Sequence, residues 1–415
     1  MRILLSAIYP YVFLLLYFII PFDNYIRVLP NILLAVLVFT FPFIVRKKDF
    51  KKLRNVPFII FVGLIAFLLL NSFVSGRFEE DFNIIKKILI AIGLVVLYIP
   101  IIEDTSEGKG TEKINSAIIF SSLAAIAFSV YNFVLITHAE GSFALGESPQ
   151  VVESLLIDRL YLGLLSVFSI LISYKSIKKT YHPNNIYHLA NVCVNAVFIV
   201  LISSKVAIVA LLLLMLIRQF YGKRKIWKVA IATLSVVAIV GLFFLLKNQS
   251  NKQWELNSES RISSTFIENS MTYELRAVVW RCASNIIKDE GFTWTGVGFI
   301  ETEDRLLDCY SESIVNEEKK AAFISEQYNT HNQFLDFYIS AGFIALLLFL
   351  IFIITSFFTV RKQFLSIALL AILVLYCSVE NVFHRQMGAY YIGFILIVLM
   401  SCANEQQIKP KEDEL

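Results

Sequence analysis

Charged residues are scarce in this chain. Only 17% of the 415 residues are Asp, Glu, Lys or Arg, whereas 57% are hydrophobic, and the mean hydropathy is +0.69. A soluble domain carries about one quarter charged residues, so the composition excludes a soluble protein and predicts an integral membrane protein. The apolar stretches are continuous rather than alternating, which excludes a transmembrane β-barrel and predicts an all-α fold.

Several motifs are also missing. No glycine-rich phosphate loop precedes a basic residue, which argues against ATP hydrolysis, and there is no Gly-x-Ser-x-Gly elbow. The first predicted outer loop contains Asp23 without an Asp-x-Asp pair, which disfavours a metal-dependent, lipid-linked glycosyltransferase. No Cys/His spacing suggests a zinc site. The net charge of +4 requires no nucleic-acid partner, because the basic residues gather in short loops.

The chain consists instead of apolar stretches of membrane length. A spanning helix needs about 20 mostly apolar residues, and on this basis we predict about twelve transmembrane helices. Their centres lie near Phe13, Leu37, Ala66, Gly93, Ala125, Val167, Ala196, Leu212, Val237, Leu347, Leu369 and Phe394. The predicted regions are transmembrane helices 1–9 (residues 1–246), a large outer loop with amphipathic helices (247–332), transmembrane helices 10–12 (333–403) and a cytoplasmic tail (404–415).

Lysine and arginine residues predict the orientation of these helices. They gather in the second, sixth and eighth loops, and short basic loops stay in the cytoplasm. Both termini are therefore expected in the cytoplasm, and the 247–332 loop is expected on the outer side of the membrane. The basic residues are then orientation signals rather than binding patches. They are Arg46, Lys47, Lys48, Lys51, Lys52, Arg54, Lys175, Lys178, Lys179, Arg218, Lys223, Arg224, Lys225 and Lys228.

The loop over residues 247–332 is the long polar block of the chain. Apolar residues recur at helical spacing within it, and Gly291 follows as a C-terminal cap, so we predict an amphipathic helix over 272–290. Gly296-Val297-Gly298 predicts a tight turn, and a second, weaker helical pattern covers 305–327. This loop also holds several side chains capable of binding or catalysis.

Arg276 is the first candidate in that loop. At about 100° per residue, Arg276 and Trp280 share one flank of the predicted helix, where the indole can pack on the guanidinium plane. Arg281 lies on the other flank and is expected to face solvent. A guanidinium group offers paired donors to phosphate or pyrophosphate. The alternative is an ordinary surface arginine on an amphipathic helix.

His331 is the candidate base. It precedes Asn332 where the loop re-enters the membrane, and an imidazole can accept a proton near neutral pH. The alternative is an interfacial histidine bonded to backbone or lipid headgroups.

Three charged residues lie in other predicted outer turns. Lys205 follows Ser203-Ser204 and either meets an anion or marks the membrane surface by snorkelling. Glu380 and Arg385 lie in the last outer turn, where they could form a structural pair or contribute to a site.

Five cysteines complete the candidate residues. Cys282 and Cys309 both fall in the predicted outer loop, where a disulfide is chemically permitted. The sequence does not show whether their Cα atoms come within bonding range. Cys193, Cys377 and Cys402 lie in or beside apolar stretches and are predicted to be packing residues.

The order of these features resembles the bacterial O-antigen ligase and O-antigen polymerase superfamily. The resemblance rests on Arg276 with Trp280, on Gly296-Val297-Gly298, and on His331-Asn332 followed by Gly342. It extends more weakly to the last outer turn and covers residues 191–399. Members commonly carry arginine where this chain has Lys205, which keeps the charge but loses the planar fork.

The resemblance implies an inverting, metal-independent glycosyltransferase of the GT-C type that needs no cofactor. Its donor would be a glycan on undecaprenyl diphosphate, presented among the membrane lipids at the periplasmic face of the bacterial inner membrane. The implied base is His331, and the implied diphosphate ligands and supporting residues are Arg276, Lys205, Arg385, Trp280, Asn332 and Glu380.

The acceptor is left open by the sequence. A ligase would transfer the glycan to lipid A–core or another glycan acceptor, whereas a polymerase would transfer it to another lipid-linked repeat. The His-Asn pair at the re-entry point and the paired loop helices favour the ligase. Two other classes are a lipid-linked oligosaccharide flippase or transporter and an envelope scaffold, but the chain shows neither matched halves nor ionisable groups at mid-membrane.

Overall fold

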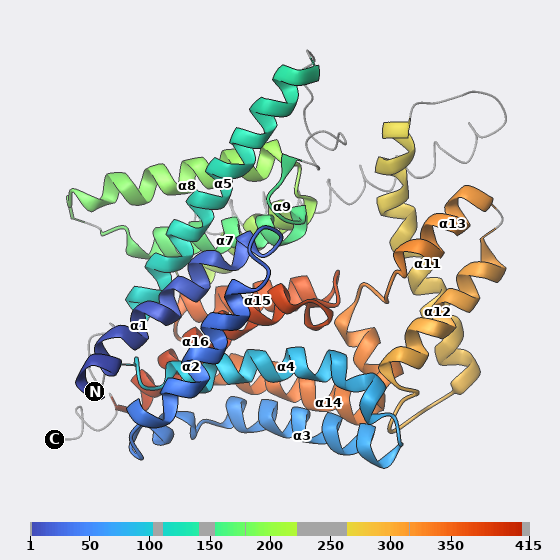
Figure 1. Cartoon of the computed structure of the whole chain (residues 1–415), viewed down its shortest axis with the longest axis horizontal. Helices are drawn as coiled ribbons and strands as arrows, with labels where there is room; N and C mark the ends of the chain where they lie inside the picture. Colours follow the sequence, from blue (N-terminus) through green and yellow to red (C-terminus); the bar gives the residue numbers. More distant parts are fainter. Residues whose placement is uncertain are drawn as a thin grey trace.

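The computed structural model describes residues 2–102, 111–140, 154–178, 180–221, 264–314 and 316–408. Within these ranges the chain is all-helical, without strands, as the sequence predicted (Figure 1). The bundle helices are α1 (Arg2–Ile19), α2 (Leu29–Ile44), α3 (Val56–Val74), α4 (Phe78–Tyr98), α5 (Glu112–Glu140), α7 (Arg159–Ser176), α8 (Asn184–Leu201), α9 (Lys205–Phe220), α14 (Gln333–Val360), α15 (Phe364–Cys377) and α16 (Gln386–Ile408). Three 3₁₀ turns join them, namely η1 (Ile20–Phe22), η2 (Asp49–Leu53) and η4 (Val382–His384).

The predicted spans coincide with these helices. Eleven of the twelve predicted centres fall inside a bundle helix, and the twelfth, near Val237, lies outside the described residues. Six described helices are long and apolar enough to cross a membrane, and α2 and α15 are shorter apolar helices. The chain is therefore a multi-pass membrane protein by its helices, while the count of about twelve spans stays a prediction.

The centre of the bundle is α16. Within its Gln386–Ala403 window 89% of residues are buried, compared with 22–44% in the other five candidate spans. Aromatic side chains fill the space around it, since Phe394 lies 5.3 Å from Phe168 of α7 and 6.3 Å from Tyr17 of α1, measured between ring centroids. The apolar helix α16 is thus enclosed by its neighbours.

Helix starts follow local sequence signals. The side chain of Asn55 accepts a hydrogen bond from the Phe58 N–H at the start of α3. Asp158 caps α7 in the same way through the Leu160 N–H, at 2.8 Å. Such caps satisfy backbone donors that a helix cannot pair internally.

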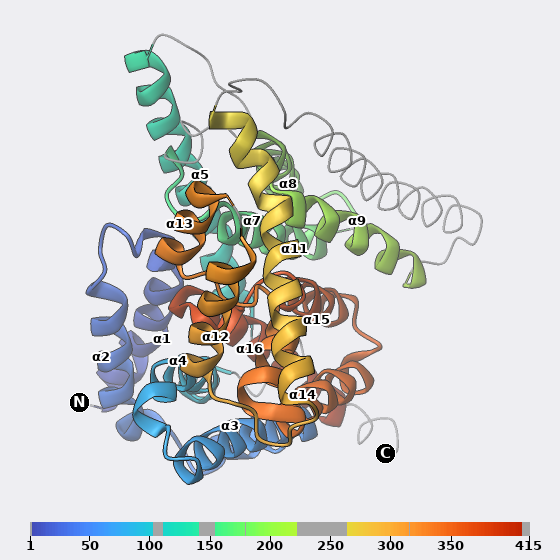
Figure 2. The same ribbon diagram turned by 90° about the vertical axis from the view of Figure 1, so that its right-hand side faces the viewer.

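A smaller helical unit stands at one end of the bundle (Figures 1 and 2). It consists of α11 (Ser264–Glu290), α12 (Phe299–Ser313) and α13 (Glu317–Glu326). The predicted amphipathic helix over 272–290 is confirmed as part of α11. The predicted helix over 305–327 is wrong in one respect, because it is two helices: Asn316 accepts a hydrogen bond from the Lys319 N–H and starts α13 as a separate helix.

The unit has its own core and a covalent link. Val279 and Ala283 of α11 are buried against Leu306 and Tyr310 of α12 and Phe323 of α13. Cys282 and Cys309, whose pairing the sequence left open, form a disulfide between α11 and α12 with a Cα–Cα distance of 5.8 Å. Cys377 and Cys402 are buried packing residues as predicted, whereas Cys193 is exposed.

A break in α14 joins this unit to the bundle. Gly342 has φ +84° and interrupts the helical hydrogen bonds. The freed carbonyls of Ile339 and Ser340 accept from the N–H groups of Val297 and Gly298 at 2.9 and 2.8 Å. The predicted turn Gly296-Val297-Gly298 therefore docks directly against the break.

The start of α4 holds the same turn from its other side. The guanidinium group of Arg77 donates to the carbonyls of Gly296 and Val297. The buried carboxylate of Asp81 accepts from the Phe299 N–H at 2.7 Å and so caps α12 from a distant part of the chain. These contacts fix the smaller unit on the end of the bundle where α14 begins.

We expect the disulfide to stabilise this unit measurably. Closing a loop of 27 residues removes unfolded-state entropy worth about 3–4 kcal/mol. Replacing Cys282 and Cys309 together by serine should therefore lower the midpoint of thermal unfolding in detergent. Cys193→Ser, at an exposed thiol, is the matched control and should not change it. Equal midpoints for the double variant and the wild type would contradict the prediction.

Candidate active site at the start of α14

The predicted base lies on the short segment that leads into α14. His331 has φ +44°, and its N–H donates to the side chain of Asn329 at 3.0 Å. The next residue, Asn332, caps α14 by accepting from the N–H groups of Phe334 and Leu335. The segment is thus shaped by backbone contacts on both sides of His331, so the direction of the imidazole is fixed by the fold.

Glu380 is the partner of His331. The Nδ1 atom of His331 lies 3.1 Å from Oε2 of Glu380, and both side chains are largely buried. Burial alone would raise the pKa of the Glu380 carboxyl, but the hydrogen bond from His331 and the positive charges of His331, Arg385 and Arg276 outweigh it and lower that pKa. A carboxylate on Nδ1 leaves Nε2 as the free ring nitrogen. Nε2 is buried and has no hydrogen-bond partner among the described residues.

Arg276 approaches the same carboxylate from α11. Its Nε donates to the carbonyl of Val379, the residue before Glu380, at 3.3 Å. Burial lowers the pKa of the Arg276 guanidinium, while the Glu380 charge opposes that shift. Trp280 does not stack on Arg276 in the described structure. Its indole N–H instead donates to the carbonyl of Thr330 at 3.1 Å, so this tryptophan supports the His331 segment.

Arg385 lies beyond Glu380 on the same turn. Its Nη1 is 3.6 Å from Oδ2 of Asp158, and its Cζ is 6.0 Å from the centre of the Tyr161 ring. Together with Arg276 it contributes to the positive potential at Glu380. Arg159 belongs to the same charged group, because its positive charge acts on Arg276.

Lys205 is placed near this group through α7. It is the first residue of α9, directly after Ser204. A Cβ atom on Gly163 would lie 2.5 Å from the Ser204 hydroxyl, so the first turns of α7 and α9 touch there. Gly163 is one helical turn from Arg159. Lys205 therefore lies at the same end of the bundle as Arg159.

Asn381 connects the segments that carry the candidate base and its partner. Its side-chain oxygen accepts from the Asn332 N–H at 2.7 Å and from the Thr330 hydroxyl at 2.9 Å. The segment before α14 and the turn after α15 are thereby held together at the residues next to His331 and Glu380. The predicted supporting residue Asn332 is thus part of this frame.

A second charged cluster, centred on His384, lies next to the cluster of His331, Glu380 and the arginines. His384 is buried with Nε2 at 2.9 Å from Asp336 and Nδ1 at 3.4 Å from Glu303. Although burial lowers the pKa of His384, the two carboxylates outweigh it and raise that pKa to about 9. Lys87 of α4 donates to the His384 carbonyl. His384 is four residues from Glu380, so this buried imidazolium anchors the turn that presents Glu380.

Several residues of the two clusters were not among the predicted site residues. Asp336 and Glu303 lie within helices, where single carboxylates are common, and nothing in the sequence distinguishes these two from others. Asp158 and Arg159 belonged to a loop with several other charges. Lys87 did carry a signal, since it begins a predicted span from the outer side against the usual charge trend.

The buried imidazolium predicts how stability depends on pH. The folded-state pKa of His384, about 9, is above the ordinary histidine pKa of 6.5. Its contribution to stability is therefore fully present below about pH 6.5 and is lost as the pH rises through about 9. We expect the thermal midpoint to fall between pH 7 and pH 10. His384→Gln should be less stable at pH 7 and show a flatter curve, whereas the exposed His138→Gln should follow the wild type. Parallel curves for His384→Gln and the wild type would contradict this.

The helices and the charged clusters together define a class, a multi-pass helical membrane protein with a histidine–carboxylate pair and arginines beside it. Residues 190–350 match the family model described as O-Antigen ligase. The match confirms the resemblance predicted from the sequence and supports the O-antigen ligase superfamily for this chain. The family implies O-antigen ligase-like membrane glycosyltransferase activity on lipid-linked glycans. No curated protein matches the chain.

The matched segment contains most of the predicted site. Lys205, Arg276, Trp280, His331 and Asn332 fall within residues 190–350. Glu380 and Arg385 lie beyond its end, so their place beside His331 and Arg276 comes from the structure alone.

Proposed function

We propose that the protein transfers a glycan from undecaprenyl diphosphate to an acceptor hydroxyl at the periplasmic face of the bacterial inner membrane. The reaction would be metal-independent and inverting, with His331 as base. The observation that carries the proposal is the pair of His331 and Glu380, in which Nδ1 meets the carboxylate at 3.1 Å and Nε2 has no partner in the part of the chain that the structure describes. An imidazole oriented by a carboxylate in this way is suited to accept a proton through its other nitrogen.

The bonds change in one displacement. Nε2 of His331 takes the proton of the acceptor hydroxyl as its oxygen forms a bond to the anomeric carbon. The bond from that carbon to the diphosphate oxygen breaks, its electrons leave with the diphosphate, and the configuration inverts. The proton is then released from His331 to solvent. A positioned base contributes roughly 10²–10⁴ to the rate.

The arginines serve the leaving group in this proposal. Charge builds up on the departing diphosphate, and fixed cations stabilise it without reorganising. Arg276 and Arg385 both act on Glu380 from nearby positions, and Lys205 lies at the same end of α7 as Arg159. The periplasmic placement is supported by the disulfide in the same helical unit, since disulfides persist in oxidising compartments.

Transfer by the purified protein tests the proposal. The protein in detergent is given a glycan on undecaprenyl diphosphate together with lipid A–core or with a second lipid-linked repeat. We expect a new glycosidic bond and released undecaprenyl diphosphate, without added metal and with chelator present. Product on lipid A–core identifies a ligase, and product on the lipid-linked repeat identifies a polymerase. Movement of the donor between leaflets without a new bond would refute the proposal in favour of a flippase.

A further inference from the structure

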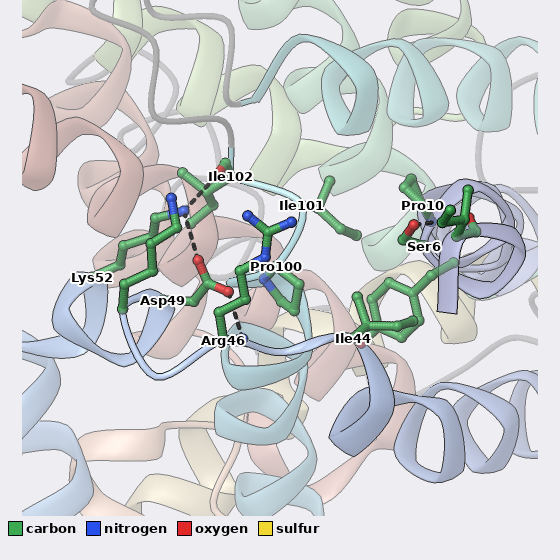
Figure 3. A pocket seen from close by; sticks show the side chains of 12 residues that line it. Ser6, Pro10, Ile44, Arg46, Asp49, Lys52, Pro100, Ile101 and Ile102 are labelled. Carbon is green, nitrogen blue, oxygen red and sulfur yellow. Dashed lines mark hydrogen bonds and ion pairs between the residues drawn. The ribbon is translucent and has the colours of Figure 1, made fainter. Parts of the chain in front are cut away.

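A cavity lies at the other end of the bundle from His331. It has a volume of about 320 Å³ and opens where α1 begins, α2 ends and α4 ends, beside η2 (Figure 3). Lys87, which contacts the His384 cluster, precedes Leu97 by ten residues of α4, or about 15 Å of helix. Tyr9, which lines the cavity, donates to the Leu97 carbonyl. The cavity is therefore separate from the proposed active site.

Positive charge dominates the polar side of this cavity. Among the described residues, Arg46, Lys48 and Lys52 line it together with a single carboxylate, that of Asp49. Asp49 is buried, accepts from the Arg46 backbone N–H at 2.8 Å, and lies 3.6 Å from Nζ of Lys52. Lys52 also donates to the carbonyls of Ile99 and Ile102. Asp49 and Lys52 thus balance one another as part of the wall.

The Arg46 guanidinium is the open cation of this cavity. Among the described residues it has no hydrogen-bond or ion-pair partner, and Figure 3 shows it between Asp49 and the apolar wall. A guanidinium group binds phosphate oxygens through paired donors. The position of the Arg46 guanidinium group therefore predicts a ligand whose phosphate group lies on this side of the cavity.

The opposite wall of the cavity is apolar and continues onto the lipid-facing surface. Pro10, Ile44 and Ile101 line it. Next to it, Ile3 is 86% exposed and Phe43 is 64% exposed. Exposed apolar side chains on bundle helices indicate the hydrocarbon layer of the membrane. The mouth therefore lies where headgroups meet acyl chains, and its volume is near the lower end of small-molecule sites, which is about 300 Å³.

We propose that this cavity binds the phosphate-bearing headgroup of an anionic phospholipid, such as phosphatidylglycerol, from the cytoplasmic leaflet. Arg46 holds the phosphate, Lys48 adds charge at the mouth, and the acyl chains lie along the exposed faces of α1 and α2. Because the side chains concerned are remote from His331, this site is independent of the transfer reaction. Two members of the basic loop, predicted from sequence to be orientation signals, thereby also contribute to a binding site.

Lipid retention by the full-length protein tests this site. Native mass spectrometry of the detergent-solubilised protein is used to titrate phosphatidylglycerol and phosphatidylcholine with the same acyl chains. We expect phosphatidylglycerol to bind more tightly. The double variant Arg46→Gln/Lys48→Gln should weaken its binding about 25-fold, because each cation near an anionic lipid contributes about 1 kcal/mol, or about fivefold.

The matched control removes the same charges from the same loop. Lys51 and Arg54 are exposed and do not line the cavity, so Lys51→Gln/Arg54→Gln should change binding less than about twofold. Equal losses in the two double variants, or equal retention of the two lipids, would overturn the proposal. Displacement of phosphatidylglycerol by millimolar inorganic phosphate would assign the cavity to free phosphate and overturn the lipid assignment.

Discussion

Asparagine in place of His331 is expected to lower the rate of glycan transfer by roughly 10²–10⁴-fold, since a positioned general base contributes that much. Asparagine suits this position because His331 has φ +44°, a conformation that asparagine tolerates better than most residues. Its amide can still meet the Glu380 carboxylate, but it cannot accept the proton of the acceptor. The rate is measured with the purified protein and a defined lipid-linked donor.

Two further variants make this result specific to the base. His138→Asn changes an exposed histidine at the end of α5 and should retain the wild-type rate. Glu380→Gln keeps the shape of the partner and removes its charge, so it should reduce the rate by less than His331→Asn does. If His331→Asn is folded, binds the donor and transfers at the wild-type rate, His331 is not the base.

The second large effect is expected at the break in α14. Gly342→Ala introduces a Cβ atom 2.2 Å from the Trp294 carbonyl oxygen, at a residue with φ +84° and ψ −178°. Backbone in this region is essentially restricted to glycine and strains other residues by about 1–3 kcal/mol. The clash is with backbone, so it adds to that strain. We expect the free energy of unfolding to fall by more than about 3 kcal/mol. We also expect most of the transfer activity to be lost.

We expect the substitution to detach the turn of Val297 and Gly298, and with it the α11–α13 unit, from α14. Val297 and Gly298 donate to carbonyls that α14 frees at its break, and a helix repaired by alanine would withdraw them. Thermal unfolding and transfer are measured together. Gly93→Ala in α4, where a Cβ would meet nothing within 4 Å, is the matched control and should be neutral or stabilising. An unchanged midpoint in Gly342→Ala would refute the role assigned to the break.

The sequence was sufficient for the helices that face lipid. Apolar stretches of membrane length have few alternatives to a helix, so eleven predicted centres fall in helices. The helix α7 differs from these, because serine residues interrupt its apolar pattern. The structure explains the difference for α7: Ser169 and Ser173 are buried and pair with Asn191 of α8 at 2.9 and 2.8 Å. A helix enclosed by other helices can carry such polar residues.

Most residues of the candidate site could be predicted from the sequence, but the contacts between them could not. Histidine, arginine and the glycine turn could be recognised from their order along the chain. The contact of Asp81 with the Phe299 N–H spans 218 residues, and that of His331 with Glu380 spans 49. Neither is encoded in local periodicity or charge. The predicted stacking of Trp280 on Arg276 was wrong for the same reason, because the indole N–H donates to the carbonyl of Thr330, a residue 50 positions away.

The cysteines determine where a reporter group can be attached to this protein. All five lie in the described residues, and four are protected: Cys282 and Cys309 by their bond, Cys377 and Cys402 by burial. Cys193 is the one exposed thiol, but it lies near the middle of α8, a candidate membrane span, so in the membrane it faces lipid and a lipid-soluble spin label is the reagent that suits it. A reporter can therefore be attached without introducing or deleting any residue, and its signal will originate from a single known position.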